Sequence, residues 1–147
     1  MRDPLGPPAA PAISGPQGPA TLYGTVVEVP DLATAVVDVD GQPVQVAILG
    51  IDASQTLPCA RPDALAFARD TIGGQQVTLV PDPTVAAPRT DSRRAYLVLA
   101  SQLSYTDAAI LAGWAAPGGP PALYRAVFDN EAREARTAAR GMWSPTC

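Results

Sequence analysis

Acidic side chains, arginines and two cysteines are the chemically active residues of this 147-residue sequence, because it contains neither histidine nor lysine. The missing histidine excludes a Ser/His/Asp triad, a Cys/His pair and a histidine-ligated zinc site. Two cysteines do not complete a zinc site on their own. Carboxylates can instead ligate a hard cation or act as a general base, and arginines can stabilise developing negative charge.

The two cysteines are Cys59 and Cys147. An isolated pair, with one member at the last position, suits a disulfide in an oxidising compartment. Two unpaired residues, acting as small apolar side chains, explain the composition equally well. The sequence by itself leaves both interpretations open.

The charge is unevenly placed along the chain. Residues 21–115 carry ten acids and five arginines, whereas residues 116–147 carry three acids and four arginines. Tight binding to a phosphate backbone depends on clustered basic side chains that release counterions. Nucleic acid is therefore not the favoured partner of the acidic part, although a local basic patch would permit binding.

Residues 1–20 contain six prolines interleaved with glycine and alanine. This composition opposes a helix or a central strand and predicts an extended arm. The folded domain is therefore expected at residues 21–147. No run of 18 apolar residues predicts a membrane span, and no signal peptide is recognisable, so we expect a soluble protein with no membrane partner. Its compartment stays open, and would be an oxidising one if Cys59 and Cys147 are paired.

The first part of this domain has the residue pattern of β-strands. Residues 21–29 are rich in β-branched residues, and residues 33–39 and 44–49 alternate around a turn at 40–43. In the third run, Val44, Val46 and Ile48 share the face expected to be buried, and Gln45, Ala47 and Leu49 the other. Two more strands are expected at 76–80 and 94–99, bridged by a proline-rich loop at 81–92.

Helical spacing predicts three helices. The first covers residues 62–72, with a proline near its start and two glycines after its end. The others cover 106–113 and 121–139. One apolar stripe runs along the last helix, formed by Tyr124, Phe128, Ala132, Ala135 and Ala139. The order of three strands, a helix, two strands and two helices predicts an α+β, mainly β, fold.

Four local motifs give this order a family resemblance. They follow one another along the chain at the expected spacing. The first two are Gly-Gln-Pro at 41–43 with Leu-Gly-Ile-Asp-Ala at 49–53, and Ala-Tyr-Leu-Val at 95–98. The last two are Leu-Ala-Gly-Trp-Ala at 111–115, and segment 131–136 with Gly-Met-Trp at 141–143. Together they resemble the staphylococcal-nuclease, or thermonuclease, family over residues 20–143. The resemblance implies a five-stranded OB-type barrel with three helices. Thermonuclease-like chains of secreted type also have cysteines near positions 59 and 147, which favours their pairing.

The family hydrolyses phosphodiesters with calcium, two aspartates, a glutamate and two arginines, so the resemblance allows each position to be checked. The family segment Asp-[Ala/Thr]-Pro-Glu falls on residues 52–55. It retains Asp52 as a metal ligand but places Gln55 where the general base belongs, and glutamine cannot accept a proton. The first phosphate-binding arginine falls on Ala47. The family therefore implies a degenerate catalytic site here.

The remaining positions are also incomplete. Ala33 takes the place of the second metal-ligating aspartate, and Asp31, Asp38 or Asp40 would have to replace it. The second arginine corresponds to Arg93 or Arg94, because the segment is shorter than in the family. Calcium is thus expected only if some activity remains, and no other cofactor is expected.

Three functions follow from this comparison. In the favoured one, the chain is a thermonuclease-fold protein that has lost nuclease activity and acts as a binding or structural module. It would be a subunit of a larger assembly and would contact its protein partners through the N-terminal arm. The alternative is a weak calcium-dependent phosphodiesterase acting on DNA or RNA. A non-catalytic OB-type single-strand binder is less favoured, because the sequence has few aromatic residues and an acidic barrel.

Overall fold

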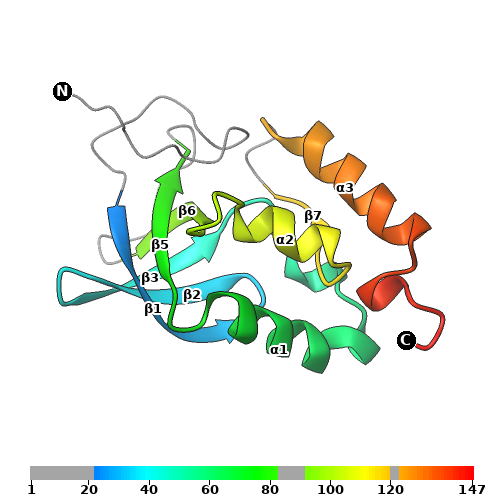
Figure 1. The fold of residues 1–147 in the computed structure, drawn as a ribbon, viewed down its shortest axis with the longest axis horizontal. Coiled ribbons are helices and arrows are strands. Elements are labelled where there is room, and N and C mark those ends of the chain that lie inside the picture. Colours follow the sequence, from blue (N-terminus) through cyan, green and yellow to red (C-terminus); the bar gives the residue numbers. More distant parts are fainter. Residues whose placement is uncertain (1–21, 83–91, 120–122) are drawn as a thin grey trace.

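The computed structural model describes residues 22–82, 92–119 and 123–147, and its centre is a closed five-stranded barrel (Figure 1). Neighbouring strands follow the order β1, β2, β3, β6, β5 around the barrel. The strands are β1 (Leu22–Asp31), β2 (Thr34–Val39), β3 (Gln42–Ile48), β5 (Gln76–Pro81) and β6 (Ser92–Val98). With three helices, this is the α+β, mainly β, OB-type barrel expected from the sequence.

Three helices cover the barrel. They are α1 (Arg61–Ile72), α2 (Tyr105–Leu111) and α3 (Arg125–Thr137). Figure 1 shows α1 beneath the barrel, and α2 between the barrel and α3. The predicted proline-rich arm at 1–20 and most of the predicted loop at 81–92 lie outside the described residues, as do the first positions of the predicted last helix.

The alternation predicted for the third strand is confirmed up to its last residue. Val46 and Ile48 are buried and Val44 is half-buried, whereas Gln45 and Ala47 are exposed. Leu49 was expected on the exposed face, and that prediction is wrong: it is 5% exposed. The reason is that β3 ends at Ile48, and Leu49 enters a turn where strand alternation no longer applies.

The two helices after the barrel strands, α2 and α3, each show how local sequence sets a helix end or a buried face. Ser104 caps α2, because its side chain accepts a hydrogen bond from the Asp107 amide. The predicted stripe of α3 is confirmed for Phe128, Ala132 and Ala135, which are buried. Ala139 is exposed and lies beyond the helix, with a φ of 55° that ends it.

A pair of carboxyl groups, Asp107 buried and Glu131 half-buried, joins α2 to α3. Asp107 is 4% exposed, and its Oδ2 accepts a hydrogen bond of 2.6 Å from the Ser104 hydroxyl. Glu131 faces it from α3, where burial and then its hydrogen bond with Asp107 raise the pKa of Glu131 to about 9. A protonated Glu131 can donate to the Asp107 carboxylate, whereas two charged groups would repel each other.

Five short elements complete the described chain. β4 (Ile51–Asp52) pairs antiparallel with β7 (Ala116–Pro117) outside the barrel. Three single-turn 3-10 helices are η1 (Ala53–Gln55), η2 (Pro58–Ala60) and η3 (Gly141–Trp143). A disulfide joins Cys59 of η2 to Cys147, with 5.6 Å between the Cα atoms. The pairing of the two cysteines is therefore confirmed, and it fixes the last described residue to the segment that precedes α1.

None of the helices in the described part of the chain is both long and apolar enough to cross a membrane.

Candidate functional site

Asp52 lies just outside the barrel, where β4 leads into η1. The pairing of Ile51 with Pro117 and of Asp52 with Ala116 fixes this segment from the other side of the chain. Gly118 then passes so close to Asp52 that any side chain at position 118 would collide with the Asp52 Cβ atom. The position of the Asp52 backbone therefore depends on a glycine 66 residues further along, which sequence reasoning missed.

The Asp52 carboxylate is engaged within its own turn. One oxygen, Oδ1, accepts hydrogen bonds from the Ser54 hydroxyl and from the Ser54 amide, the latter at 3.1 Å. The other, Oδ2, accepts from the Gln55 side-chain amide at 2.9 Å. These bonds, chiefly the one from the Ser54 side chain and then that from Gln55, lower the pKa of Asp52. Asp52 is thus a charged cap of η1.

Asp31 is engaged in the same way at the turn between β1 and β2. Its Oδ1 accepts from the Ala33 amide at 2.8 Å, and its Oδ2 accepts from the Thr34 hydroxyl at 3.2 Å. This is the local turn chemistry for which aspartate is favoured. Ala33 itself packs against the core as a half-buried residue.

Asp38 and Asp40 lie at the opposite end of β2 from this turn. Asp38 pairs with Pro43, and Asp40 has a φ of 52° in the tight turn that leads to β3. At about 3.3 Å per residue, they are roughly 13 to 20 Å along the strand from Thr34. Of the three acids considered as replacements for a carboxylate at position 33, only Asp31 therefore lies at the same end of the barrel as Asp52.

The register of the barrel separates the two arginines that the sequence left unresolved. β3 and β6 pair in parallel, with Val46 opposite Arg93 and Ala47 opposite Arg94. Directly opposed residues share a face of the sheet, so Arg94 lies on the outer face with Ala47, and Arg93 on the face of the buried Val46. Thr34 of β2 flanks Ala47 on the other side. Within the described residues, no arginine is in ion-pair contact with Asp52.

The donor set around Asp52 is a poor fit to a calcium ion. Calcium takes six to eight oxygen ligands, usually including several carboxylates. Here the Asp52 carboxylate accepts hydrogen bonds from Ser54 and Gln55, and Gln55 presents its amide nitrogen, which cannot ligate a cation, to Asp52. In the described ranges, no three acidic or cysteine side chains gather into a cation site.

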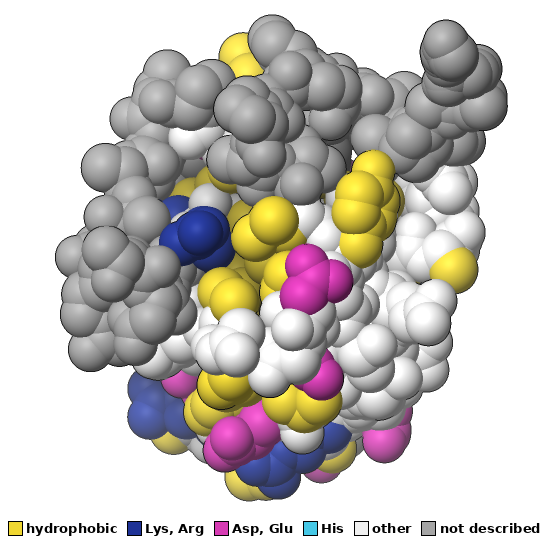
Figure 2. All heavy atoms as spheres, turned by 90° about the vertical axis from the view of Figure 1, so that its left-hand side faces the viewer, with side chains coloured by type: hydrophobic (Ala, Val, Ile, Leu, Met, Phe, Trp, Pro, Cys, Tyr) yellow, Lys and Arg dark blue, Asp and Glu magenta, His cyan; other side chains and the backbone are white. Residues whose placement is uncertain are grey.

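The face shown in Figure 2 has no basic patch that would indicate nucleic-acid binding by the described residues. Acidic, basic and hydrophobic side chains of the described residues are interspersed there, without a continuous basic patch. Such mixing does not favour the backbone-tracking groove that single-stranded nucleic acid requires.

Comparison with known proteins leaves the family open. The chain matches no protein-family model and no curated protein. The resemblance to thermonucleases therefore rests on the order and spacing of the four sequence motifs, and its functional implications are carried forward as a proposal.

Proposed function

We propose that this chain is a thermonuclease-like barrel that has lost most or all phosphodiester hydrolysis and acts as a protein-binding or structural module. The observation that carries the proposal is the hydrogen bond from Gln55 Nε2 to Asp52 Oδ2. At the position where the resemblance places a general base, this side chain is a donor that holds the neighbouring carboxylate. A group in that role does not deprotonate a water molecule.

The neighbouring positions support the same proposal. The methyl group of Ala47 is exposed on the outer face of β3, where the resemblance places a phosphate-binding arginine. Losing a general base costs about 10² to 10⁴ in rate, and losing a donor at the developing charge about 10² to 10³. Losses among groups that act together are not additive, but each alone is large.

Exposed apolar side chains support the binding part of the proposal. Tyr23 and Val27 of β1 are 56% and 60% exposed. Leu123, which precedes α3, and Val127, in the first turn of α3, are also exposed. Two such pairs on a small domain are compatible with partner contacts.

A digestion assay tests the loss of hydrolysis. The full chain is incubated with single-stranded DNA, with calcium or with a chelator, beside the variants Asp52→Ala and Asp63→Ala. Asp63 is an exposed acid of α1 and serves as the matched control. We expect no calcium-dependent cleavage that distinguishes the three proteins. Cleavage that requires calcium and is abolished by Asp52→Ala, but kept in Asp63→Ala, would overturn the proposal.

Weak calcium-dependent phosphodiesterase activity is a second candidate, favoured by one observation. Arg94 lies opposite Ala47 on the same face of the sheet, so a guanidinium group is available one strand away from the missing arginine. If this arginine serves the reaction, cleavage in the assay above should fall further in Arg94→Gln than in Arg133→Gln, an exposed arginine of α3.

The assembly through the N-terminal arm is tested by deleting residues 1–20. We expect the full chain to form assemblies in sedimentation or light-scattering measurements, and the shortened chain to remain monomeric. The circular dichroism spectrum and the thermal midpoint of the barrel should stay unchanged. Equal assembly of the two chains would count against a role of the arm.

A further inference from the structure

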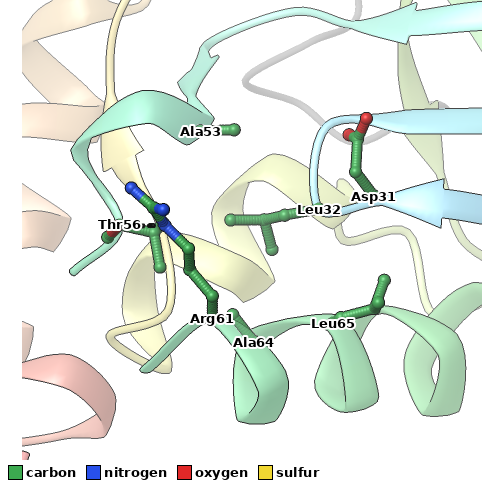
Figure 3. Close-up of a pocket in the computed structure, with 7 residues that line it drawn as sticks. All are labelled: Asp31, Leu32, Ala53, Thr56, Arg61, Ala64 and Leu65. Carbon is green, nitrogen blue, oxygen red and sulfur yellow. Dashed lines mark hydrogen bonds between the residues drawn. The ribbon is translucent and has the colours of Figure 1, made fainter. Parts of the chain in front are cut away.

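A small hollow lies between the β1–β2 turn, η1 and the start of α1 (Figure 3). Its volume is about 190 Å³. Leu32 projects into it from the turn, Ala53 closes it from η1, and Leu65 lines it from α1. The hollow is separate from the hydrogen bonds of Asp52, because neither Ser54 nor Gln55 lines it.

The body of the hollow is apolar. Ala64 and Leu65 form its floor in Figure 3, and Leu32 its inner wall. Dry apolar cavities of about 150 Å³ accept a ligand as large as benzene. The space in this hollow therefore suits one branched or cyclic apolar group of about four to six carbon atoms.

The guanidinium group of Arg61 lies on one side of the hollow. Arg61 is the first residue of α1, and its Nε donates to the Thr56 carbonyl at 3.2 Å. This bond orients the guanidinium group and leaves its two terminal nitrogens without a described acceptor. In the part of the chain that the structure describes, no carboxylate pairs with Arg61.

The carboxylate of Asp31 lies on the other side of the hollow. Figure 3 shows the Asp31 carboxylate across Leu32 from the Arg61 guanidinium. Its two oxygens accept from the Ala33 amide and the Thr34 hydroxyl, and each oxygen keeps a further lone pair. No described cation is in ion-pair contact with Asp31. Two oppositely charged groups thus flank one apolar hollow without neutralising each other.

We propose that this hollow binds an amino-acid unit with a leucine-sized side chain, a free carboxylate and an N–H donor. The side chain fills the apolar space, the carboxylate accepts hydrogen bonds from Arg61, and the nitrogen donates to Asp31. Guanidinium groups match carboxylates in a bidentate geometry, which makes Arg61 the selective element. Two sources share this chemistry, a free amino acid and the C-terminal residue of a peptide. The inference does not depend on whether the barrel hydrolyses phosphodiesters.

The ligand chemistry is tested by titrating the isotope-labelled, disulfide-bonded protein and following backbone amide shifts by NMR. The probes are L-leucine, the peptide Gly-Gly-Leu, the C-terminal amide of each, and glycine. We expect saturable shifts at Leu32, Ala53 and Leu65 with the free acids, about tenfold weaker binding of the amides, and no saturation with glycine. Tighter binding of leucine assigns the free amino acid, and tighter binding of the peptide assigns the peptide terminus.

Matched variants keep the proposal falsifiable. Arg61→Gln removes the charge while its amide can still reach the Thr56 carbonyl, and Asp31→Asn keeps an oxygen for the Ala33 amide. The controls are Arg69→Gln, whose arginine likewise donates from Nε to a carbonyl, that of Val29, at 3.2 Å, and Asp70→Asn. Ala53→Leu fills the hollow directly.

We expect Arg61→Gln and Asp31→Asn each to weaken leucine or peptide binding about tenfold, Ala53→Leu to abolish it, and both controls to bind as the unchanged protein does. Absence of saturable binding by the unchanged, folded protein at millimolar ligand would overturn the proposal. So would equal binding of acids and amides, or binding that none of the three site variants weakens.

Discussion

The Asp52 carboxylate receives its hydrogen bonds from residues two and three positions along the chain, so its environment is decided almost entirely by local sequence. Ser54 and Gln55 both donate to it. Family resemblance identified the position, but it did not predict that Gln55 would turn its amide nitrogen toward Asp52. That orientation follows from the η1 turn, which brings residues 52 and 55 together.

At the residue scale, we expect Ser54→Ala and Gln55→Ala to raise the pKa of Asp52, the serine variant more strongly. The reason is that the Ser54 side chain contributes most to lowering this pKa, followed by Gln55. Because the folded-state pKa is depressed, the stabilisation from Asp52 is present above its unfolded pKa of about 3.9 and is lost as the pH falls below it. An NMR titration that follows the Asp52 carboxyl carbon measures its pKa in each variant and therefore which substitution raises it more. Unchanged pKa values in both variants would contradict the assigned hydrogen bonds.

The buried stripe of α3 follows from local periodicity, whereas the contact of its polar residue Glu131 depends on packing between elements. The helical stripe correctly predicted Phe128, Ala132 and Ala135 as buried, because 3.6-residue periodicity is a local property. Nothing in the sequence indicated that Glu131 would face Asp107, since 24 residues separate them and only the packing of α3 on α2 brings them together. The same holds for β4 and β7, whose pairing joins residues 64 and 66 positions apart.

At the element scale, we expect Glu131→Gln to flatten the pH dependence of stability. The pKa of Glu131 is raised to about 9 in the folded protein, against about 4.3 when unfolded. The folded state therefore holds a proton that the unfolded state has released, and stability falls as the pH rises between these two values. Glutamine stays neutral and still donates to Asp107, so the variant should be more stable at pH 9 by about 1–2 kcal/mol, allowing for solvent screening of a half-exposed group.

Urea unfolding at pH 5 and pH 9 measures this effect, with Glu134→Gln as the control. Glu134 is exposed on the same helix and pairs with Arg140. A control that flattens the pH dependence as much as Glu131→Gln would show that the effect arises from helix charge and not from the buried pair.

The whole molecule depends on connections between distant parts of the chain. The parallel pairing of β3 with β6 closes the barrel, and the disulfide fixes the C-terminal residue to η2. Met142, Ala60 and Ala116 form a small apolar cluster beside this connection. Arg136 lies 5.1 Å from the Trp143 ring centroid and covers it. The C-terminal segment is therefore held by packing as well as by the covalent bond.

At this scale, we expect the double variant Cys59→Ser/Cys147→Ser to lose about 3–4 kcal/mol of unfolding free energy. The bond closes a loop with a sequence separation of 88 residues, and its loss restores chain entropy to the unfolded state. Denaturant unfolding with and without reductant measures the loss. The double variant should not respond to reductant, and an unchanged midpoint on reduction of the native chain would contradict this role.

Sequence alone predicted the five barrel strands, the three helices and most of the buried faces, because these follow from short-range periodicity, turn residues and proline or glycine at element ends. The resemblance drawn from it named Asp52, Gln55 and Ala47 as positions of a degenerate site, which stays a prediction, and the residues alone left the cysteine pairing open. Only the tertiary structure decided that Arg94 rather than Arg93 shares a face with Ala47, that Gly118 passes against Asp52, and that Asp31 and Arg61 flank one hollow. Each of these depends on barrel register or on contacts between distant segments, which local spacing does not encode.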